Sequence, residues 1–244
     1  MKKMMFALVL ALAVSACGAA MAEQGVAYGV YNQGSEQPDS LIRVTLDCDG
    51  AQVTGAQIDE KLIPYSASGA EGWAELDDET AAKLGGAVLT VGEKKYPQSF
   101  ELGGLTFVGA AEESGLAYTG EVNGETVNLM DYICTDEGGA WYYASNPATL
   151  LNAQGEEAAE IEIGTKASIE HGVAFWPSDI KFPGNIERIE NYLTENGVNY
   201  TEEQIAKGED GVWAVADVTT GATLAGTKNY LLIAQRAYEN AQGK

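Results

Sequence analysis

Histidine and the common catalytic motifs are almost missing from this chain of 244 residues. His171 is its only histidine, no cysteine or acidic cluster with metal-ligand spacing accompanies it, and no G-x-S-x-G sequence is present. A histidine-rich metal site is therefore excluded, and a Ser-His-Asp hydrolase would have to use that one histidine without its usual nucleophile turn. The sequence also has neither a Walker A loop nor a G-x-G-x-x-G fingerprint, which removes two common ways of binding a nucleotide.

Basic residues are also scarce: 14 lysines and arginines stand against 36 aspartates and glutamates, a formal net charge of −22. Removal of residues 1–22, which include two lysines, leaves 12 basic residues against the same 36 acids, a net charge of −24. A surface this negative repels nucleic acid and anionic lipid headgroups, so both are excluded as partners of the folded domain. The charge favours solubility, and it also suits a partner with a basic docking face.

Cysteine and proline are the other scarce residues, with three and six copies beside 29 glycines. Little proline and much glycine indicate an ordered chain with many tight turns. Apart from Cys17, only Cys48 and Cys134 are present, and they either form one disulfide in an oxidising compartment or remain two buried thiols. The roughly 220 residues after the first segment suffice for one sizeable core, as one domain or as two small lobes.

The first 22 residues have the pattern of an export signal. A basic start at residues 1–3 precedes an apolar run over residues 6–16, which is too short to span a bilayer as a helix. Residues 20–22, Ala-Met-Ala, form one cleavage site, and Val-Ser-Ala-Cys ending at Cys17 resembles a bacterial lipobox as the alternative. We therefore expect residues 1–22 to be a signal peptide, or a lipoprotein signal that ends before Cys17. In both cases the mature protein is expected outside the cytoplasm, in the periplasm or at the cell surface. Only the lipobox alternative gives it a membrane anchor, which is a lipid on Cys17.

Alternating apolar residues and turn signals predict strands over the first two thirds of the chain. The Asn123-Gly124 pair favours a type I′ turn and therefore a tight hairpin. The aromatic run at residues 141–143 also has a strand-like composition. The predicted strand segments are a hairpin over residues 40–58, strands at 88–91 and 102–109, and a second hairpin over 118–129.

Helices are predicted mainly in the last third of the chain. Asp77 is expected to cap an early short helix that ends at Gly85. Asn185 is expected to cap a second helix that ends at Gly197, and Thr227 to cap a C-terminal helix with an apolar stripe. Strands followed by helices indicate an α+β fold with a mostly antiparallel sheet and with helices clustered toward the C-terminus.

The sequence Asp-Val-Thr-Thr-Gly-Ala-Thr at residues 217–223 is the one stretch suited to presenting a reactive side chain. It lies between the apolar run 212–215 and the C-terminal helix, and the small residues before Thr223 allow another molecule to approach the backbone closely. This stretch resembles the flavinylation motif D-G-x-S/T-G-A-T of FMN-binding domains. It is also similar to the S/T-G-A-T segment in the FMN-carrying subunits of sodium-pumping and Rnf-type redox complexes. Val218 replaces the glycine often found in the family, whereas the T-G-A-T core matches.

The resemblance implies that residues 23–244 form an FMN-binding domain. It implies that FMN is joined to Thr223 by a phosphoester, and that a separate flavin transferase makes this bond. A threonine hydroxyl is a weak nucleophile, so its activation is expected from the transferase. The residues implied for the recognition loop are Asp217, Thr220, Gly221 and Ala222.

The resemblance also implies a role in electron transfer between a membrane or soluble donor and an extracytoplasmic acceptor, with the flavin performing the redox chemistry. Aromatic side chains should flank the flavin, and Trp176 is favoured because its proline-containing segment is expected to be irregular. The other aromatic candidates are Tyr142, Tyr143 and Trp213. Two alternatives stay open: a cofactor-free solute-binding or surface-adhesion lipoprotein, in which the motif is an ordinary turn, and an extracytoplasmic flavin-dependent reductase.

Overall fold

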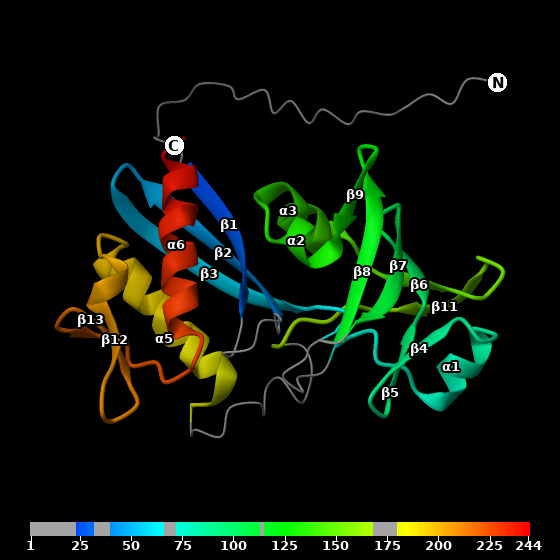
Figure 1. Ribbon diagram of the computed structural model, residues 1–244. Helices are drawn as coiled ribbons and strands as arrows, with labels where there is room; N and C mark the ends of the chain where they lie inside the picture. The colour runs from blue at the N-terminus through cyan, green and yellow to red at the C-terminus, as the bar shows by residue number, and fades with distance from the viewer. Residues whose placement is uncertain (1–22, 32–39, 66–71, 113–114, 168–179) are drawn as a thin grey trace.

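Two separate hydrophobic cores divide the protein into two lobes (Figure 1). The computed structural model describes residues 23–31, 40–65, 72–112, 115–167 and 180–244. The first core is built from both ends of the chain, and we call residues 23–62 and 164–244 the terminal lobe. The second core lies mainly within residues 62–163, and we call residues 63–163 the inserted lobe. The architecture is α+β with antiparallel sheets and two helices near the C-terminus, so the predicted fold class is confirmed.

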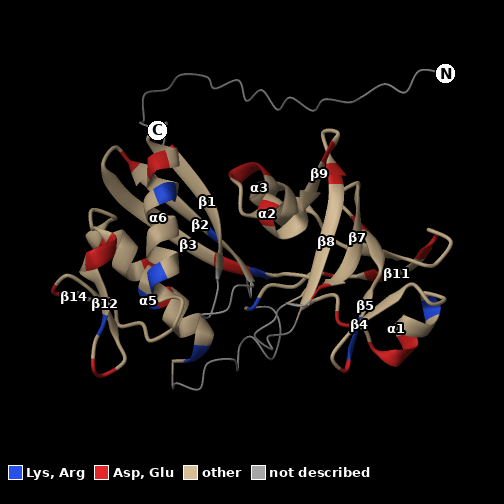
Figure 2. Ribbon diagram, viewed as in Figure 1, with Lys and Arg blue, Asp and Glu red and all other residues tan. Residues whose placement is uncertain are grey.

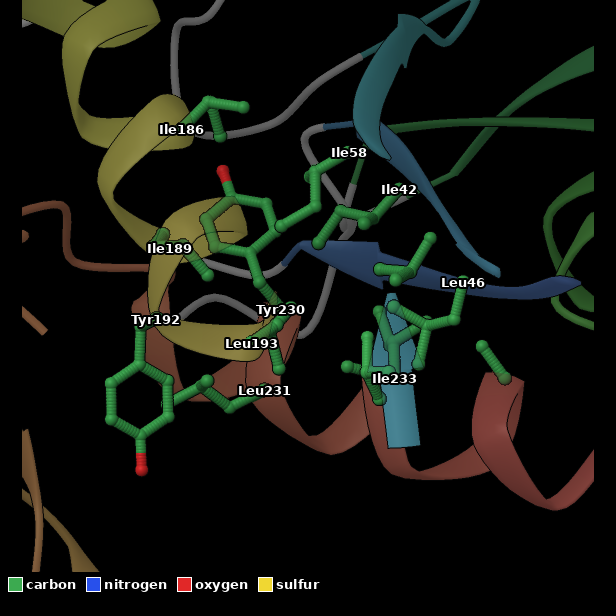
Figure 3. Packing of buried hydrophobic residues seen from close by; sticks show 14 of the residues in the cluster. Ile42, Leu46, Ile58, Ile186, Ile189, Tyr192, Leu193, Tyr230, Leu231 and Ile233 are labelled. Carbon is green, nitrogen blue, oxygen red and sulfur yellow. The ribbon is translucent and has the colours of Figure 1, made fainter. Parts of the chain in front are cut away.

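A three-stranded antiparallel sheet and two helices form most of the terminal lobe. Strands β1 (Glu23–Tyr31), β2 (Ser40–Asp49) and β3 (Gln52–Leu62) are ordered β1-β2-β3. Helix α5 (Lys181–Asn196) packs against β3, and helix α6 (Thr227–Ala241) packs against β1 and β2. Alternate residues of β2, including Ile42 and Leu46, lie in one core with Tyr230 and Ile233 of α6 (Figure 3). The predicted first hairpin and the apolar stripe of the C-terminal helix are both confirmed.

A small sheet completes the terminal lobe and leads into α6. Its strands are ordered β12-β13-β14, with β13 pairing to both neighbours in antiparallel fashion. Val215 and Ile205 face the first core, which attaches this small sheet to α5 and α6. The bounds are β12 (Ile205–Lys207), β13 (Trp213–Val215) and β14 (Val218–Thr219), preceded by the 3-10 helix η1 (Glu202–Gln204).

The inserted lobe is built around a six-stranded antiparallel sheet of order β11-β10-β6-β7-β8-β9. Three short helices, α1 (Asp78–Lys83), α2 (Leu129–Ile133) and α3 (Asp136–Ala144), and a separate hairpin, β4 (Val88–Val91) and β5 (Lys94–Pro97), accompany it. As predicted, Asp77 caps α1 by accepting a bond from the Thr80 amide, and Gly85 follows the helix with φ of +59°. The sheet strands are β6 (Ser99–Leu102), β7 (Leu105–Glu112), β8 (Gly115–Val122), β9 (Glu125–Asn128), β10 (Ala148–Leu151) and β11 (Glu157–Ile161).

The chain enters and leaves the inserted lobe at adjacent points. The Leu62 amide donates to the Gly164 carbonyl at 3.1 Å, and the Lys166 amide donates to the Glu60 carbonyl at 2.8 Å. Lys61 and Thr165 form an antiparallel bridge between these two bonds. The inserted lobe is therefore an insertion of about a hundred residues into the terminal lobe, and the chain segments at its two ends are hydrogen-bonded to each other.

Acidic side chains outnumber basic ones on both lobes (Figure 2). In the inserted lobe the basic residues are confined to Lys83, Lys94 and Lys95, because residues 96–165 contain neither lysine nor arginine. The negative charge predicted from composition is thus spread over the whole molecule.

The prediction of a strand at residues 141–143 is wrong, because these residues lie in helix α3. Thr135 caps this helix by accepting from the Gly138 amide at 3.0 Å. Gly138 and Gly139 allow close packing: a Cβ on Gly138 would lie 2.0 Å from the Tyr132 carbonyl oxygen, and one on Gly139 would lie 2.4 Å from the Tyr28 ring. Contacts with other parts of the protein therefore make residues 141–143 helical, although their composition favours a strand.

Three predicted boundaries also need correction. The strand predicted over residues 102–109 is interrupted by a turn at Gly103 and Gly104, both of which have positive φ, so it becomes the end of β6 and most of β7. Helix α5 begins at Lys181 and not at Asn185, because Pro183 falls in the first turn, where a missing N–H has no cost. Thr227 is the first residue of α6, and Gly226 occupies the cap position.

Lys61 joins the two lobes through the C-terminal end of α3. Its Nζ donates to the carbonyl oxygens of Tyr142 at 2.7 Å and Ser145 at 2.8 Å, and its side chain is buried. A lysine at this position satisfies carbonyls that the end of a helix leaves unpaired. Burial, with a further contribution from the positive charge of Arg43, lowers the pKa of Lys61 to about 8.

The shifted pKa of Lys61 makes the stability of the protein depend on alkaline pH. Between pH 8 and the ordinary lysine pKa of about 10.4, the unfolded chain binds a proton at Lys61 that the folded chain has lost, so the free energy of unfolding rises with pH. We expect Lys61→Met to lower stability by about 1–3 kcal/mol at pH 7.5, because α3 loses its donor. The stability difference between wild type and variant should grow from pH 8 to pH 10, as measured by urea denaturation; a constant difference would contradict the assignment.

Candidate functional site

The motif at residues 217–223 runs from the turn between β13 and β14 to the residues before α6. Val215 pairs with Val218, and Ala216 and Asp217 form the turn between them, with Ala216 at a φ of +52°. Asp217 is exposed at this turn, and Val218 beside it is 47% exposed. Asp217 and Val218 therefore form an accessible edge of the motif.

Thr220 and Ala222 fix the centre of the loop against β13. The Thr220 hydroxyl donates to the Trp213 carbonyl at 2.8 Å and accepts from the Ala222 amide at 3.1 Å. The Trp213 amide in turn donates to the Ala222 carbonyl at 2.8 Å. Thr220 and Ala222 are both buried, so they hold the shape of the loop and are not themselves presented to a partner.

Asn185 of α5 orients Thr223. Its Oδ1 accepts from the Thr223 amide at 2.6 Å and from the Thr223 hydroxyl at 3.2 Å, while its Nδ2 donates to the Lys181 carbonyl at 2.6 Å. Asn185 is fully buried, whereas Thr223 is partly exposed. Because an amide oxygen is a very weak base, Asn185 positions the hydroxyl without activating it.

Arg188, one turn further along α5, holds Gly221. Its Nη1 donates to the Gly221 carbonyl at 2.6 Å, and Gly221 has a φ of +72°. That conformation favours glycine, and a Cβ at this position would approach the Arg188 Cδ to 3.4 Å. Arg188 is exposed and lines a hollow of about 230 Å³ together with Tyr192 and the start of the motif loop.

Of the five predicted loop residues, Gly221 and Thr223 are bonded to α5, Thr220 and Ala222 are bonded to β13, and Asp217 is exposed at the preceding turn. Sequence reasoning missed Asn185 and Arg188 as site residues, because they precede Thr223 and Gly221 by 38 and 33 positions. One signal was present: asparagine is unfavourable inside a helix, and Asn185 inside α5 is explained by its bonds to Thr223.

The aromatic candidates are distributed differently. Trp176, the favoured one, and His171 lie outside the described residues. Tyr142 is fully buried in the inserted lobe, where it donates to the Leu62 carbonyl, and Tyr143 donates to the Leu41 and Asp59 carbonyls. Trp213 is the one described candidate that bonds directly to the motif loop, through its backbone, and its indole packs beside the first core.

The indole nitrogen of Trp213 is a buried donor with no partner among the described residues. Buried N–H groups of this kind are uncommon, because each one costs desolvation free energy. The donor lies in the strand that carries the motif loop.

The described residues were compared with the side-chain clusters that bind metal ions in proteins. Over the residues that the structure describes, no group of three or more histidines, cysteines, aspartates or glutamates is placed to hold a metal ion. Cys48 and Cys134 are both free thiols and form no disulfide; Cys48 is buried, Cys134 is partly buried, and burial raises the pKa of each. Neither is therefore set up as a reactive thiolate.

Within the described ranges, no helix has the length and apolar character needed to cross a bilayer. A comparison with protein-family models, with curated proteins and with solved structures gave no match for this chain.

Proposed function

We propose that this protein is an exported FMN-binding flavoprotein that carries FMN by a phosphoester on Thr223 and transfers electrons to an extracytoplasmic acceptor. The observation that carries the proposal is the setting of Thr223: a partly exposed hydroxyl ends the D-V-T-T-G-A-T loop and is oriented by the buried Asn185. The tethered flavin supplies the electron transfer, and the residues of this chain hold and orient it.

Attachment is a group transfer onto the Thr223 oxygen. A bond forms between Thr223 Oγ1 and the FMN phosphorus of a flavin dinucleotide donor, and the phosphoanhydride bond of that donor breaks. The nucleoside monophosphate leaves with the bridging oxygen, and the hydroxyl proton passes to a base of the transferase. The Thr223 hydroxyl donates to the Asn185 amide oxygen at 3.2 Å, and an amide oxygen is too weak a base to take that proton. We assign the base to a separate flavin transferase, for which Thr223 is a positioned substrate.

The compartment gives covalent attachment a physical purpose. A flavin bound only by weak contacts would be diluted away outside the cytoplasm, whereas a phosphoester keeps it on the protein. The strongly acidic surface suits redox donors and acceptors with basic docking faces, because complementary charge accelerates association. Donor and acceptor are accordingly expected to be proteins or small molecules that approach the motif side of the terminal lobe.

The proposal predicts a yellow protein whose colour survives unfolding. When the mature chain is produced together with an export-competent flavin transferase, denatured with guanidinium and passed over a desalting column, flavin absorbance should elute with the polypeptide. Production without the transferase is the control and should give a colourless protein. A colourless product made alongside a transferase that modifies a second substrate protein would overturn the proposal.

A further inference from the structure

Arg188 differs from the other two arginines of this acidic chain. Arg43 is paired with Asp59 at 2.5 Å, and Arg236 with Asp136 at 3.5 Å. Arg188 has no ion pair with any acid in the described parts of the chain, although α5 and the loops around it carry many acids. In a protein of this net charge, an exposed guanidinium without a carboxylate partner is in a suitable state to bind an anion.

The position of Arg188 places that guanidinium beside the attachment residue. Asn185 and Arg188 are three residues apart on α5, so they lie on the same face of the helix. The first holds Thr223 and the second holds Gly221, two residues earlier in the loop. Gly221 and Thr223 are two residues apart, so their Cα atoms lie at most about 7 Å from each other. The combined length of an arginine side chain and a phosphate is enough to cover that distance.

The bond to Gly221 uses only one of the N–H donors of the Arg188 guanidinium. One Nη1–H is directed at the Gly221 carbonyl, and an arginine has five N–H donors in all. The Arg188 side chain is exposed, and it also borders a hollow of about 230 Å³ that is lined by Tyr192, Glu195 and residues 218–220 and not by Thr223. A phosphodiester carries one negative charge shared by two non-bridging oxygens, which a guanidinium can bind through two parallel N–H···O bonds.

We propose that Arg188 binds the phosphate of the flavin tethered to Thr223, an inference that rests on the proposed function. Arg188 first offsets the repulsion between the acidic protein and the incoming flavin nucleotide, and afterwards holds the phosphodiester against α5. It is a binding residue for the tethered cofactor and takes no part in breaking or making the phosphoester.

The first test measures loading. The wild type, Arg188→Gln and Arg188→Lys would be incubated with a flavin transferase and a flavin dinucleotide, and the mass adduct followed over time. Loss of a charge-assisted hydrogen bond predicts loading about tenfold slower for Arg188→Gln, with partial recovery in Arg188→Lys. Arg236→Gln is the matched control, because it removes an arginine elsewhere on the terminal lobe, and it should load at the wild-type rate.

The second test separates phosphate binding from a role in holding the loop. If Arg188 only holds the loop through Gly221, its guanidinium proton exchange should be the same in unloaded and loaded wild type. A phosphate-binding arginine gains slowly exchanging N–H protons on loading, visible by nuclear magnetic resonance of arginine-labelled protein. Unchanged Arg188 exchange in a fully loaded wild type would overturn the inference while leaving the proposed function intact. Absence of any adduct on the wild type would overturn both.

Discussion

We expect Thr223→Val to abolish the flavin adduct and to leave the fold intact. Valine has nearly the shape of threonine and keeps the backbone N–H that donates to Asn185 at 2.6 Å, but it lacks the oxygen that the phosphoester requires. The lost hydroxyl bond to Asn185 should cost about 1 kcal/mol of stability, because Thr223 is only partly buried. Intact mass after co-production with the transferase reads the adduct, and thermal unfolding followed by circular dichroism reads the fold.

Two neighbouring substitutions make the Thr223 result specific. Thr223→Ser keeps a hydroxyl at the same position and should still be loaded. Thr219→Val removes an exposed hydroxyl four residues earlier and should load fully, although its bond from the Gly221 amide is lost. An adduct retained in Thr223→Val would place the attachment elsewhere and refute the central proposal.

Lys166→Met lowers the free energy of unfolding by about 3–5 kcal/mol, the usual cost of removing one partner of a buried ion pair. Lys166 Nζ lies 2.5 Å from the Glu60 carboxylate, and both side chains are almost completely buried. Glu60 also accepts from Ser40 at 2.5 Å and from the hydroxyl of Tyr230. The variant leaves the Glu60 charge inside the protein with two neutral donors, in place of an ammonium group.

The control for Lys166→Met is the same substitution in an exposed pair. Lys95 lies 2.7 Å from Asp78, but both side chains are largely exposed, so Lys95→Met should change stability by less than about 1 kcal/mol. Adding Glu60→Gln to Lys166→Met should recover part of the loss, because the uncompensated charge disappears. Urea denaturation of the four proteins measures all of these values, and equal effects of the two lysine substitutions would contradict the buried network.

Local chemistry made part of the fold predictable from the sequence. Asn123 and Gly124 have φ angles of +55° and +86°, as their turn type requires, and Asp77 caps α1 through its own side chain. The failures have a different origin: α3 exists because Gly138 and Gly139 fit against residues of other segments, which no local pattern displays. The start of α5 was wrong because Asn185 has the residue type of a cap, while its amide serves a loop 38 residues away.

The candidate site could likewise be predicted only in part from the sequence. The motif at residues 217–223 is continuous in sequence and could be recognised there, whereas Asn185 and Arg188 become part of the site only when α5 packs beside the loop. The roles of the loop residues also could not be read from their types: Thr220 resembles Thr223 in sequence, yet it is buried and bonded to β13. Trp176 as a flavin-stacking residue stays a prediction, since it lies outside the described residues.

The adjacent ends of the inserted lobe have a consequence for the order of folding. The inserted lobe is one continuous stretch, and the residues outside it that are buried in its core, Tyr28, Leu41 and Leu62, precede it in the chain, so this core can form before α5 and α6 have been made. The core of the terminal lobe needs β1–β3 together with α5 and α6, so those strands must wait for more than a hundred further residues. The loop with Thr223 is assembled in that last step, because Asn185 and α6 are both late in the chain. A transferase that reads the folded loop would therefore modify only molecules whose synthesis is complete.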